Sequence, residues 1–288
     1  MIRQLTEKLQ FPKEASEYLD ECLDKILKTD SAMHYMGLAM DSFFLPGSEE
    51  YTEHLQKVSD LSGVHRYSVD MVFILLCAKP LRYIYQNKGL GEELFIDTMM
   101  DAKYKLVECK AVHNIWGTFV LTWFKGFFTL DRFKLGRLQY DKCKNHFGSH
   151  GDILSENDMV LSCHIPSAGP LNIEDVKDSL RQAYKFHKDI AKDGKLKVVC
   201  GSWLLHTELV KKLKPESNIR KFHDLFNILV DVDRENIDFW RIFNKQYKEG
   251  ILDEVVPENS LQKTVLEHLK SGGTTGWGLG IIIVDENY

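Results

Sequence analysis

The first third of the chain carries apolar residues at helical spacing. After Pro12, apolar side chains recur every three or four positions through residues 15–27, which places them on one face of an amphipathic helix. Pro12 suits the first turn of that helix, because the N–H that proline lacks has no partner there. Further helices are expected over 48–61, from about residue 68, and over 92–113.

The segment from residue 68 holds the longest apolar run. Met71–Ala78 is apolar for eight residues and is followed by Lys79 and Pro80. A helix that is apolar on every side is usually buried, so we expect this segment at the centre of the first third. Pro80 should kink or end the helix, because proline removes a backbone hydrogen bond.

The pattern changes after Trp116. Two aromatic-rich segments, 123–130 and 133–140, flank Asp131-Arg132 and predict a β-hairpin. Strands and helices then alternate, which is typical of a mixed sheet with helices packed on it. The expected strands are 159–165, 196–204, 219–231 and 277–284, and the expected helices are 173–187, 207–213, 236–247 and 260–269.

This change of pattern predicts two domains. Residues 1–115 are expected to form a helical N-terminal domain, and residues 116–288 an α+β or α/β domain with a mixed β-sheet flanked by helices. A chain of 288 residues has room for both. Its 44% of hydrophobic residues is enough for buried cores. The sequence carries no signal for an oligomeric state.

Charge and hydropathy exclude two classes of function. The formal net charge is −5 and the sequence pI about 6.1, whereas a nucleic-acid-binding domain usually has a basic surplus. The longest apolar run is far shorter than the roughly 20 residues of a membrane-spanning helix. The first residues, from Met1 to Lys8, lack the apolar core of a signal peptide. We therefore expect a cytoplasmic protein that binds neither nucleic acid nor membrane.

The six cysteines give no metal signature. They are spaced 20 or more positions apart and form no C-x-x-C pair, so reduced, mostly buried thiols are expected. Cys143, His146 and His150 have a metal-like spacing but supply only three ligands in a polar loop. No metal is therefore expected. The glycine-rich stretch 271–278 has no Gly-Lys-Ser/Thr ending and leads into a strand, which favours a mobile turn over a phosphate loop.

Four short segments resemble one known family, in the family's order. They are FKLGRLQY at 133–140, HIPSAGPL at 164–171, SWLL at 202–205 and SNI at 217–219. The family is a bacterial group of acyltransferase-domain proteins, which join a helical N-acyltransferase N-terminal domain to a GNAT-like C-terminal domain. The similarity runs over nearly the whole chain.

The resemblance implies a binding site for acetyl-CoA or another acyl-CoA as co-substrate. In GNAT folds the fourth and fifth strands splay apart, and the pantetheine arm lies in the gap. The pyrophosphate then binds backbone N–H groups at the start of the following helix. Carried onto this sequence, the fourth strand is 159–165 and the fifth ends near Trp203. The implied cofactor-binding residues are Ile165, Pro166, Ser167, Ala168, Gly169 and Trp203.

Two departures from the GNAT pattern keep a second interpretation open. The usual arginine or glutamine before a glycine-rich run is missing, and Glu174 and Asp175 stand in the first helical turn. Their charge already complements the helix dipole and would repel a pyrophosphate. The alternative is a non-catalytic GNAT-like protein that binds a ligand or partner. A basic cluster that could meet phosphates is formed by Lys211, Lys212, Lys214, Arg220 and Lys221.

Candidate catalytic residues follow from the chemistry of acyl transfer to an amine. The reaction needs a base for the amine proton and donors for the oxyanion and the leaving thiolate. His164, at the end of the implied fourth strand, is the candidate base, with a structural histidine as the alternative. Ser202, at the end of the next strand, is a candidate donor, with helix capping as its alternative.

Three further residues complete the candidate site. Asp224 falls on the apolar face of the expected strand 219–231, where desolvation marks a functional carboxylate unless a partner neutralises it. Arg137 is its expected partner and, with Gln139 on the same face of the hairpin, a candidate substrate-binding residue. A thiol hydrolase built on Cys200 and His164 is a third, weaker hypothesis.

The leading hypothesis is therefore an acyltransferase. It would move an acyl group from acyl-CoA to an amine of a small molecule or peptide.

Overall fold

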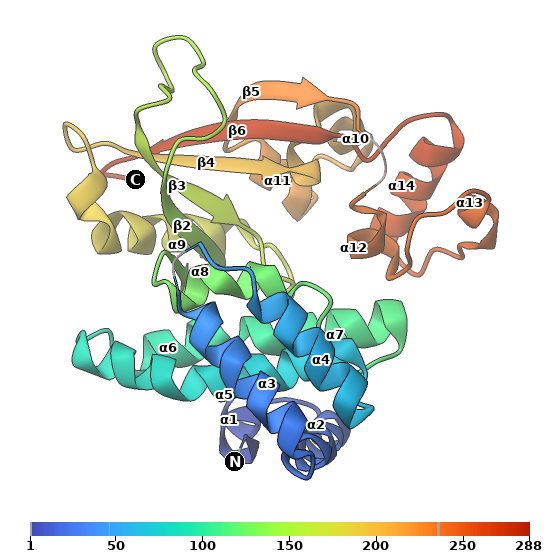
Figure 1. Cartoon of the computed structure of the whole chain (residues 1–288). Helices are drawn as coiled ribbons and strands as arrows, with labels where there is room; N and C mark the ends of the chain where they lie inside the picture. Colours follow the sequence, from blue (N-terminus) through green and yellow to red (C-terminus); the bar gives the residue numbers. More distant parts are fainter. Residues whose placement is uncertain (1, 46, 235–236) are drawn as a thin grey trace. The chain divides into compact units, whose positions relative to one another are not determined.

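The computed structural model describes residues 2–45, 47–234 and 237–288, which form two compact units (Figure 1). The units are Met1–Leu130 and Asp131–Tyr288. The expected boundary after residue 115 therefore differs from the observed division, which lies between Leu130 and Asp131.

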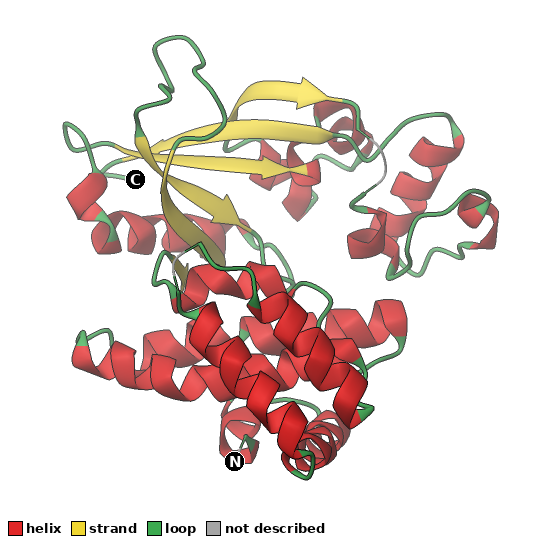
Figure 2. Ribbon diagram, viewed as in Figure 1, coloured by secondary structure: helices red, strands yellow, loops and turns green. Residues whose placement is uncertain are grey.

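The first unit is built from helices, with no strand among its described residues (Figure 2). The elements are α1 (Arg3–Lys8), α2 (Lys13–Leu27), α3 (Asp30–Phe43), α4 (Tyr51–Ser62), α5 (Arg66–Asn87), α6 (Glu92–Met99), α7 (Asp101–His113), the 3₁₀ helix η1 (Leu121–Phe124) and α8 (Lys125–Phe128). The sequence pattern did not predict α3. The expected helix over 92–113 is two helices, α6 and α7.

Helix α5 forms the buried centre of this unit, as its apolar run predicted. Residues 68–75 are fully buried or nearly so. Phe73 meets Phe43 edge to face at 5.1 Å between ring centroids, and Phe43 meets Phe128 at the same distance. Pro80 lies inside α5, which continues to Asn87. Of the two expected effects of Pro80, a kink or a helix end, the helix end is therefore excluded.

The aromatic segment 123–130 is helical, and the strand predicted there was wrong. Phe124 ends η1, Phe127 lies in α8 three positions later, and both are fully buried. Aromatic residues favour strands only where a pleated surface receives them. Here the helical spacing lets both rings enter the core of the first unit, with their centroids 5.7 Å apart. The boundary between the units therefore follows this segment.

The second unit contains a six-stranded sheet in the order β1-β2-β3-β4-β6-β5. Its strands are β1 (Arg132–Leu135), β2 (Leu138–Lys144), β3 (Met159–His164), β4 (Leu196–Ser202), β5 (Asn227–Val232) and β6 (Trp277–Val284). All neighbouring pairs are antiparallel except β3 and β4, which are parallel. The mixed sheet with helices was predicted correctly.

The helices of this unit lie between the strands of the sequence. They are α9 (Ile173–Phe186), η2 (Lys188–Ile190), η3 (Trp203–Leu205), α10 (Thr207–Lys212), α11 (Asn218–His223), α12 (Phe239–Phe243), α13 (Ile251–Glu254) and α14 (Ser260–Lys270). Helix α12 lies within the expected helix 236–247, whose first residue, Asn236, is outside the described residues.

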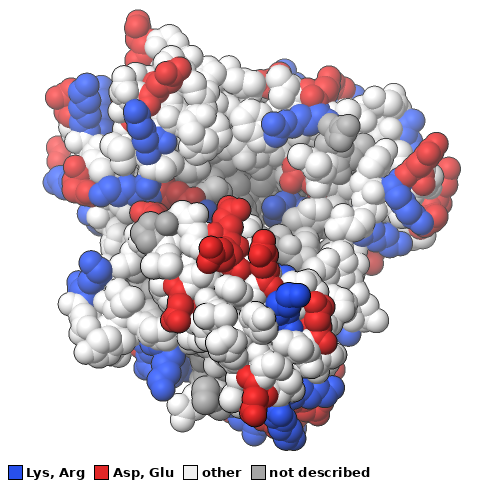
Figure 3. Space-filling view, viewed as in Figure 1, with Lys and Arg blue, Asp and Glu red and all other residues white. Residues whose placement is uncertain are grey.

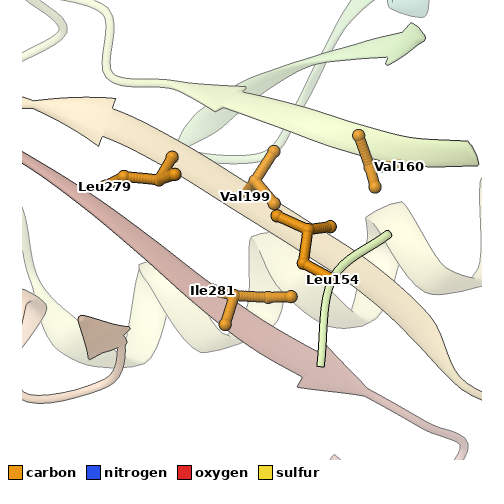
Figure 4. Packing of buried hydrophobic residues seen from close by; sticks show 5 residues of the cluster. All are labelled: Leu154, Val160, Val199, Leu279 and Ile281. Atoms are coloured by element: carbon orange, nitrogen blue, oxygen red, sulfur yellow. The ribbon is translucent and has the colours of Figure 1, made fainter. Parts of the chain in front are cut away.

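One face of the sheet packs against the loop between β2 and β3. On one face Val160, Val199, Leu279 and Ile281 pack around Leu154, which comes from the loop between β2 and β3 (Figure 4). Asn145 holds this loop, since its side-chain amide donates to the carbonyls of Gly148 and Ser155 at 2.8 and 2.9 Å. Alternation along β3 and β4 points Cys163 and Cys200 to the other face.

Two predicted strands were placed wrongly. Segment 133–140 is not one strand of a hairpin but a hairpin in itself, in which Leu135 pairs with Leu138 across a two-residue turn. The expected strand 219–231 is the short helix α11 followed by β5. The Ser217 hydroxyl accepts the N–H of Arg220 at 3.2 Å, and this N-cap starts a helix where apolar alternation suggested a strand.

The surface carries charges of both signs. On the face seen in Figure 3, Lys and Arg side chains are interspersed with Asp and Glu. Among the described residues no single helix is long and apolar enough to cross a membrane, and only α4 and α5 taken together, bent by 117°, reach the required length and composition.

Candidate functional site

The two central strands part at their C-terminal ends. Strands β3 and β4 pair at only two positions, Leu161 with Val198 and Ser162 with Val199. Both strands continue beyond these pairs, to His164 and to Ser202. The backbone of their last residues therefore makes no ladder with the other strand, which is the splay that a GNAT-like sheet is expected to have.

Trp277 covers one side of the separated ends. A Cβ atom on Gly201 would lie 2.6 Å from Cζ2 of the Trp277 indole, so only glycine lets the ring lie this close to β4. Arg234 places its guanidinium carbon 4.9 Å from the centroid of the same ring. The gap thus has an aromatic wall on the face that also holds Leu154 and Val160.

The turn that follows β3 is held by one arginine. Arg137 donates from Nη1 to the carbonyl of Pro166 at 3.0 Å, from Nη2 to that of Gly169 at 2.9 Å, and from Nε to that of Pro170 at 3.0 Å. In a trans peptide the N–H points opposite to the C=O. The N–H groups of Ser167 and Leu171 therefore point away from Arg137.

Helix α9 fixes the position of Arg137. The buried Ser179 hydroxyl accepts the N–H of Leu138 at 3.1 Å and lies 2.9 Å from the Tyr140 hydroxyl. It also donates to the carbonyl of Leu135. Gly136 has φ +68°, and a Cβ there would lie 3.3 Å from Cα of Ser179. The hairpin is thus anchored to α9 on both sides of its turn, and Arg137 leaves that turn toward residues 166–170.

The N-terminus of α9 lies next to this turn. The first N–H groups of this 14-residue helix have no intrahelical acceptor. Asn172, the N-cap residue, makes no side-chain cap either. The two acidic residues of the first turn each have a partner. Lys177 lies 3.2 Å from Glu174, and the Asn172 amide donates to Asp175 at 3.2 Å.

The basic helix α11 reaches the same place. The side-chain amide of Asn218, the first residue of α11, lies 3.4 Å from the Asn172 side-chain oxygen. Arg220 in this helix donates to the carbonyls of Lys211 and Leu213 at 3.4 and 3.3 Å, which ties it to the end of α10. Part of the basic cluster noted in the sequence therefore adjoins the start of α9.

His164 is hydrogen-bonded to a carboxylate that the sequence did not point to. Its Nε2 lies 3.0 Å from Oδ2 of Asp141 in β2, and the same carboxylate forms a two-point ion pair with Arg132. Burial acts to raise the pKa of Asp141, but the hydrogen bonds from His164 and Arg132 outweigh it and hold that pKa below its ordinary value. Asp141 is therefore ionised, and the Nε2 of His164 donates to it. In the neutral ring Nδ1 then carries the lone pair.

Gln139 lies directly across the β2–β3 pair from His164. Its side chain is 1% exposed, and its Nε2 has no hydrogen-bond partner. The structure therefore places Gln139 beside His164 and separates it from Arg137, which turns to the 166–170 segment.

Ser202 and Trp203 lie at the end of β4. The Ser202 hydroxyl oxygen accepts the N–H of Leu204 at 3.2 Å and so caps the 3₁₀ helix η3. Its own proton can still be donated. Trp203 is 9% exposed, in keeping with a packed side chain.

The expected pair between Asp224 and Arg137 does not form. Asp224 ends α11, its side chain is 64% exposed, and its carboxylate lies 3.2 Å from Nδ1 of His223. Arg137 is engaged by the carbonyls of the turn. The prediction was wrong because it depended on a strand over 219–231, which is α11 at this point.

The two thiol-based hypotheses also fail on geometry. Strand alternation puts Cys200 and Cys163 on the face opposite to His164, where both thiols are buried. The ring Nε2 of His150 lies 3.0 Å from the Phe147 carbonyl, and His146 stacks on the ring of the same Phe147. The described residues therefore offer neither a Cys200–His164 pair nor a Cys143 metal site.

A charged groove lies at the other end of β3 and β4. Its volume is about 710 Å³, and its lining includes Asp158, Asp189, Lys192 and Lys197. It is at the start of the strands, away from His164 and from the 166–170 turn. We therefore assign it no part in the candidate site.

Two family models match the chain. The N-acyltransferase N-terminal domain matches residues 1–130, and the GNAT-like C-terminal domain matches residues 132–282. These limits agree with the division between the two compact units. None of the curated proteins matches the chain.

Three solved structures illustrate the fold. An acyltransferase in complex with decanoyl-CoA and teicoplanin is 16% identical with a TM-score of 0.75, over 98% of this chain and 87% of that one. An acyltransferase variant in complex with octanoyl-CoA is 16% identical with a TM-score of 0.77, over 97% and 86%. An acyltransferase in complex with decanoyl-CoA is 20% identical with a TM-score of 0.75, over 97% and 86%.

The GNAT-like model alone spans more than half of the chain, and the second model accounts for nearly all of the remainder. The protein belongs to the family that joins an N-acyltransferase N-terminal domain to a GNAT-like C-terminal domain.

Proposed function

We propose that the protein transfers an acyl group from acyl-CoA to an amine. The observation that carries the proposal is the separation of β3 and β4 after Ser162 and Val199, next to a turn in which three carbonyls accept hydrogen bonds from Arg137. Such a gap accepts an extended chain, and such a turn presents N–H groups to an anion.

In this proposal the donor lies along the gap between the strands. The pantetheine arm follows the backbone of β3 that is not paired with β4. The pyrophosphate meets the N–H groups of Ser167 and Leu171 and the first N–H groups of α9, whose start has no side-chain cap. Arg220 and Lys221 on α11 are available for the remaining phosphate. The similar structures hold octanoyl- and decanoyl-CoA, which favours medium-chain donors over acetyl-CoA.

His164 is the proposed base. With Nε2 donating to Asp141, Nδ1 takes a proton from the acceptor amine as the amine nitrogen attacks the thioester carbonyl. The C–N bond forms, the C–S bond breaks, and the CoA sulfur leaves with the bonding electron pair. Ser202, like Cys200, lies on the face of β4 opposite to His164, so the thiolate takes its proton from the His164 imidazolium. Asp141 holds the ring in place and stabilises the imidazolium that forms.

The proposed acceptor is an amine of a small molecule or peptide. One similar acyltransferase is in complex with teicoplanin, which supports an acceptor of this class. The cytoplasmic location expected from the sequence is part of the proposal, because acyl-CoA is an intracellular donor.

The test is an acyl-transfer assay. Octanoyl- and decanoyl-CoA are incubated with the protein and a panel of amines that includes amino sugars, lysine peptides and glycopeptides. Free CoA is followed with a thiol reagent, and the product by mass spectrometry. We expect amide product that depends on the protein. A donor that binds but yields no product with any amine would overturn the catalytic assignment.

That result would favour the second candidate, a non-catalytic GNAT-like binding protein. The observation behind it is the pair of acidic residues at the start of α9, Glu174 and Asp175. Their negative charges would repel a pyrophosphate. Lys177 offsets part of the charge of Glu174, whereas the partner of Asp175 is the neutral amide of Asn172.

A further inference from the structure

Two buried histidines in the second unit each have one ring nitrogen without a partner. They are His206, 4% exposed between η3 and α10, and His268, 3% exposed in α14. The atoms without hydrogen-bond partners are Nε2 of His206 and Nδ1 of His268. Leaving a buried polar atom unpaired costs free energy, so each position calls for an explanation.

The other nitrogen of His206 fixes its tautomer. Nδ1 lies 2.7 Å from Oδ1 of Asp231 in β5. An ionised carboxylate only accepts hydrogen bonds, so Nδ1 donates. In the neutral ring Nε2 therefore carries a lone pair.

His268 is fixed in the same way by a backbone carbonyl. Its Nε2 lies 3.0 Å from the carbonyl oxygen of Thr274. That oxygen can only accept, so Nε2 donates and Nδ1 carries the lone pair. Histidines that bind metals are oriented by this kind of contact, with one nitrogen donating to a carboxylate or carbonyl and the other facing the ion.

Two carboxylates face the lone pairs. Oδ1 of Asp233 lies 3.5 Å from Nε2 of His206, and Oε1 of Glu208 lies 3.9 Å from Nδ1 of His268. Donor atoms of His206, Glu208 and Asp233 all lie within 4.8 Å of one another. These nitrogen–oxygen distances are too long for good hydrogen bonds. They approach the roughly 3.4 Å between neighbouring donors of a tetrahedral zinc site with bonds of about 2.1 Å.

The glycine-rich segment before β6 closes around both rings. A Cβ on Gly273 would lie 2.1 Å from Cε1 of His268, and a Cβ on Gly276 would lie 2.2 Å from Cδ2 of His206. Between them, the Thr274 hydroxyl donates to Oδ1 of Asp233 at 3.1 Å. The segment that the sequence suggested was a mobile turn therefore packs against both candidate ligands.

We propose that His206, His268, Glu208 and Asp233 bind a divalent transition-metal ion. Two imidazole nitrogens with two carboxylates suit Zn²⁺ and its first-row neighbours, whereas Mg²⁺ and Ca²⁺ prefer oxygen ligands throughout. The carboxylate side chains are 58% and 70% exposed, so the ion enters from solvent, and small rotations of these side chains complete its coordination.

The ion links elements that are far apart in sequence. It joins the start of α10, the end of β5 and α14, while the 271–276 segment encloses the two histidines. The C-terminal ends of β4 and β5 lie at the same edge of the sheet as that of β3, because β4 is parallel to β3 and both β4 and β5 pair antiparallel with β6. The metal therefore stabilises the sheet edge that also carries the candidate site.

The experiment titrates Zn²⁺ into full-length protein that carries no polyhistidine tag and has been freed of metal by a chelator. We expect one Zn²⁺ per chain by calorimetry and by elemental analysis after dialysis. Glu208→Gln and Asp233→Asn should each weaken binding at least tenfold. Both side chains are exposed, so the variants should fold. Asp224→Asn is the matched control, since it also removes an exposed carboxylate beside a histidine, and it should bind like wild type.

A second readout uses Co²⁺. Tetrahedral Co²⁺ absorbs visible light strongly, so the wild-type protein should become coloured with one equivalent, and the Glu208→Gln, Asp233→Asn double variant should not. Lack of saturable binding at 100 µM Zn²⁺ would overturn the proposal. So would binding that persists unchanged in the double variant, because the ion would then be held elsewhere.

Discussion

His164 and Asp141 form the pair on which the proposed chemistry depends. Two groups bind the Asp141 carboxylate, and one of them, Arg132, also fixes its orientation through two hydrogen bonds. His164 is 27% exposed and stands at the last position of β3. The ring is thus held in place by a fixed anion at the end of β3, as a positioned general base requires.

The base is tested by His164→Gln. The amide retains much of the size and polarity of the ring but cannot take the amine proton, so kcat should fall by roughly 10²- to 10⁴-fold. The Kd for acyl-CoA should change less than twofold, as measured by calorimetry. Asp224→Asn should leave both quantities unchanged. A His164→Gln enzyme with wild-type kcat would remove His164 from the mechanism.

The buried carboxyl group of Asp70 should make the stability of the protein depend on pH. Burial raises the pKa of Asp70 from 3.8 to about 6, although its ion pair with Arg66, 2.7 Å away, acts in the opposite direction. The folded state therefore binds the proton more tightly than the unfolded state. The stabilisation is complete below about pH 4 and is lost as the pH rises through 6.

Asp70→Asn copies the protonated side chain. Between pH 4 and pH 7.5 its free energy of unfolding should rise, relative to that of wild type, by up to about 3 kcal/mol, so the variant becomes the relatively more stable protein at high pH. Urea unfolding at both pH values measures this change. Asp24→Asn on α2 is an exposed control, for which the difference should stay flat. A flat difference for Asp70→Asn would contradict the inferred effect of burial.

At the scale of elements, the hairpin of β1 and β2 fixes the conformation of the turn after β3. Ser179 anchors its turn, Gly136 allows the close approach to α9, and Arg137 collects three carbonyls. Arg137 is thus a positioning residue, which acts on acyl-CoA through the shape of residues 166–170.

Arg137→Lys tests that role. An ammonium group has no planar fork and cannot satisfy three separated carbonyls at once, so the turn should loosen. The Kd for decanoyl-CoA should rise about tenfold, which is about 1.4 kcal/mol, while kcat at saturating donor stays within threefold. Arg181→Lys, on the exposed side of α9, should have no effect. An unchanged Kd together with a reduced kcat would instead make Arg137 a catalytic residue.

The same elements show how far the sequence could be interpreted. Strand β6 was predicted with its observed limits, and β3, β4, α9 and α14 within two residues. These segments have strong local patterns and clear caps or turns. Segment 123–130 and the first part of 219–231 were predicted as strands but are helical. Their aromatic side chains are buried from helices, which local alternation does not reveal.

Parts of the site depend on contacts that no local pattern contains. His164, Ser202 and the 166–170 turn became candidates because they lie at or just after the ends of predicted strands. Asp141 was missed, since its place beside His164 follows from the register of β2 on β3. The proposed metal ligands come from three separate stretches of chain, with no short spacing to mark them, which is why no metal was expected.

At the scale of the whole molecule, the family assignment and the geometry of the sheet support the same function. Two family models cover both units, and the solved structures similar over nearly the whole chain are acyltransferases. In the second unit, the separated strand ends, the turn, the histidine and the proposed metal ligands all lie at one edge of the sheet.

The most direct measurement of the central claim is calorimetric titration with decanoyl-CoA. The account predicts saturable 1:1 binding in the micromolar range. Ser167→Glu should raise the Kd at least tenfold, because it places a negative charge where the pyrophosphate is proposed to lie. Ser31→Glu, an exposed serine on α3, is the control and should bind like wild type. Absence of binding of acetyl-, octanoyl- and decanoyl-CoA at millimolar concentration, or an unchanged Kd in Ser167→Glu, would contradict the account.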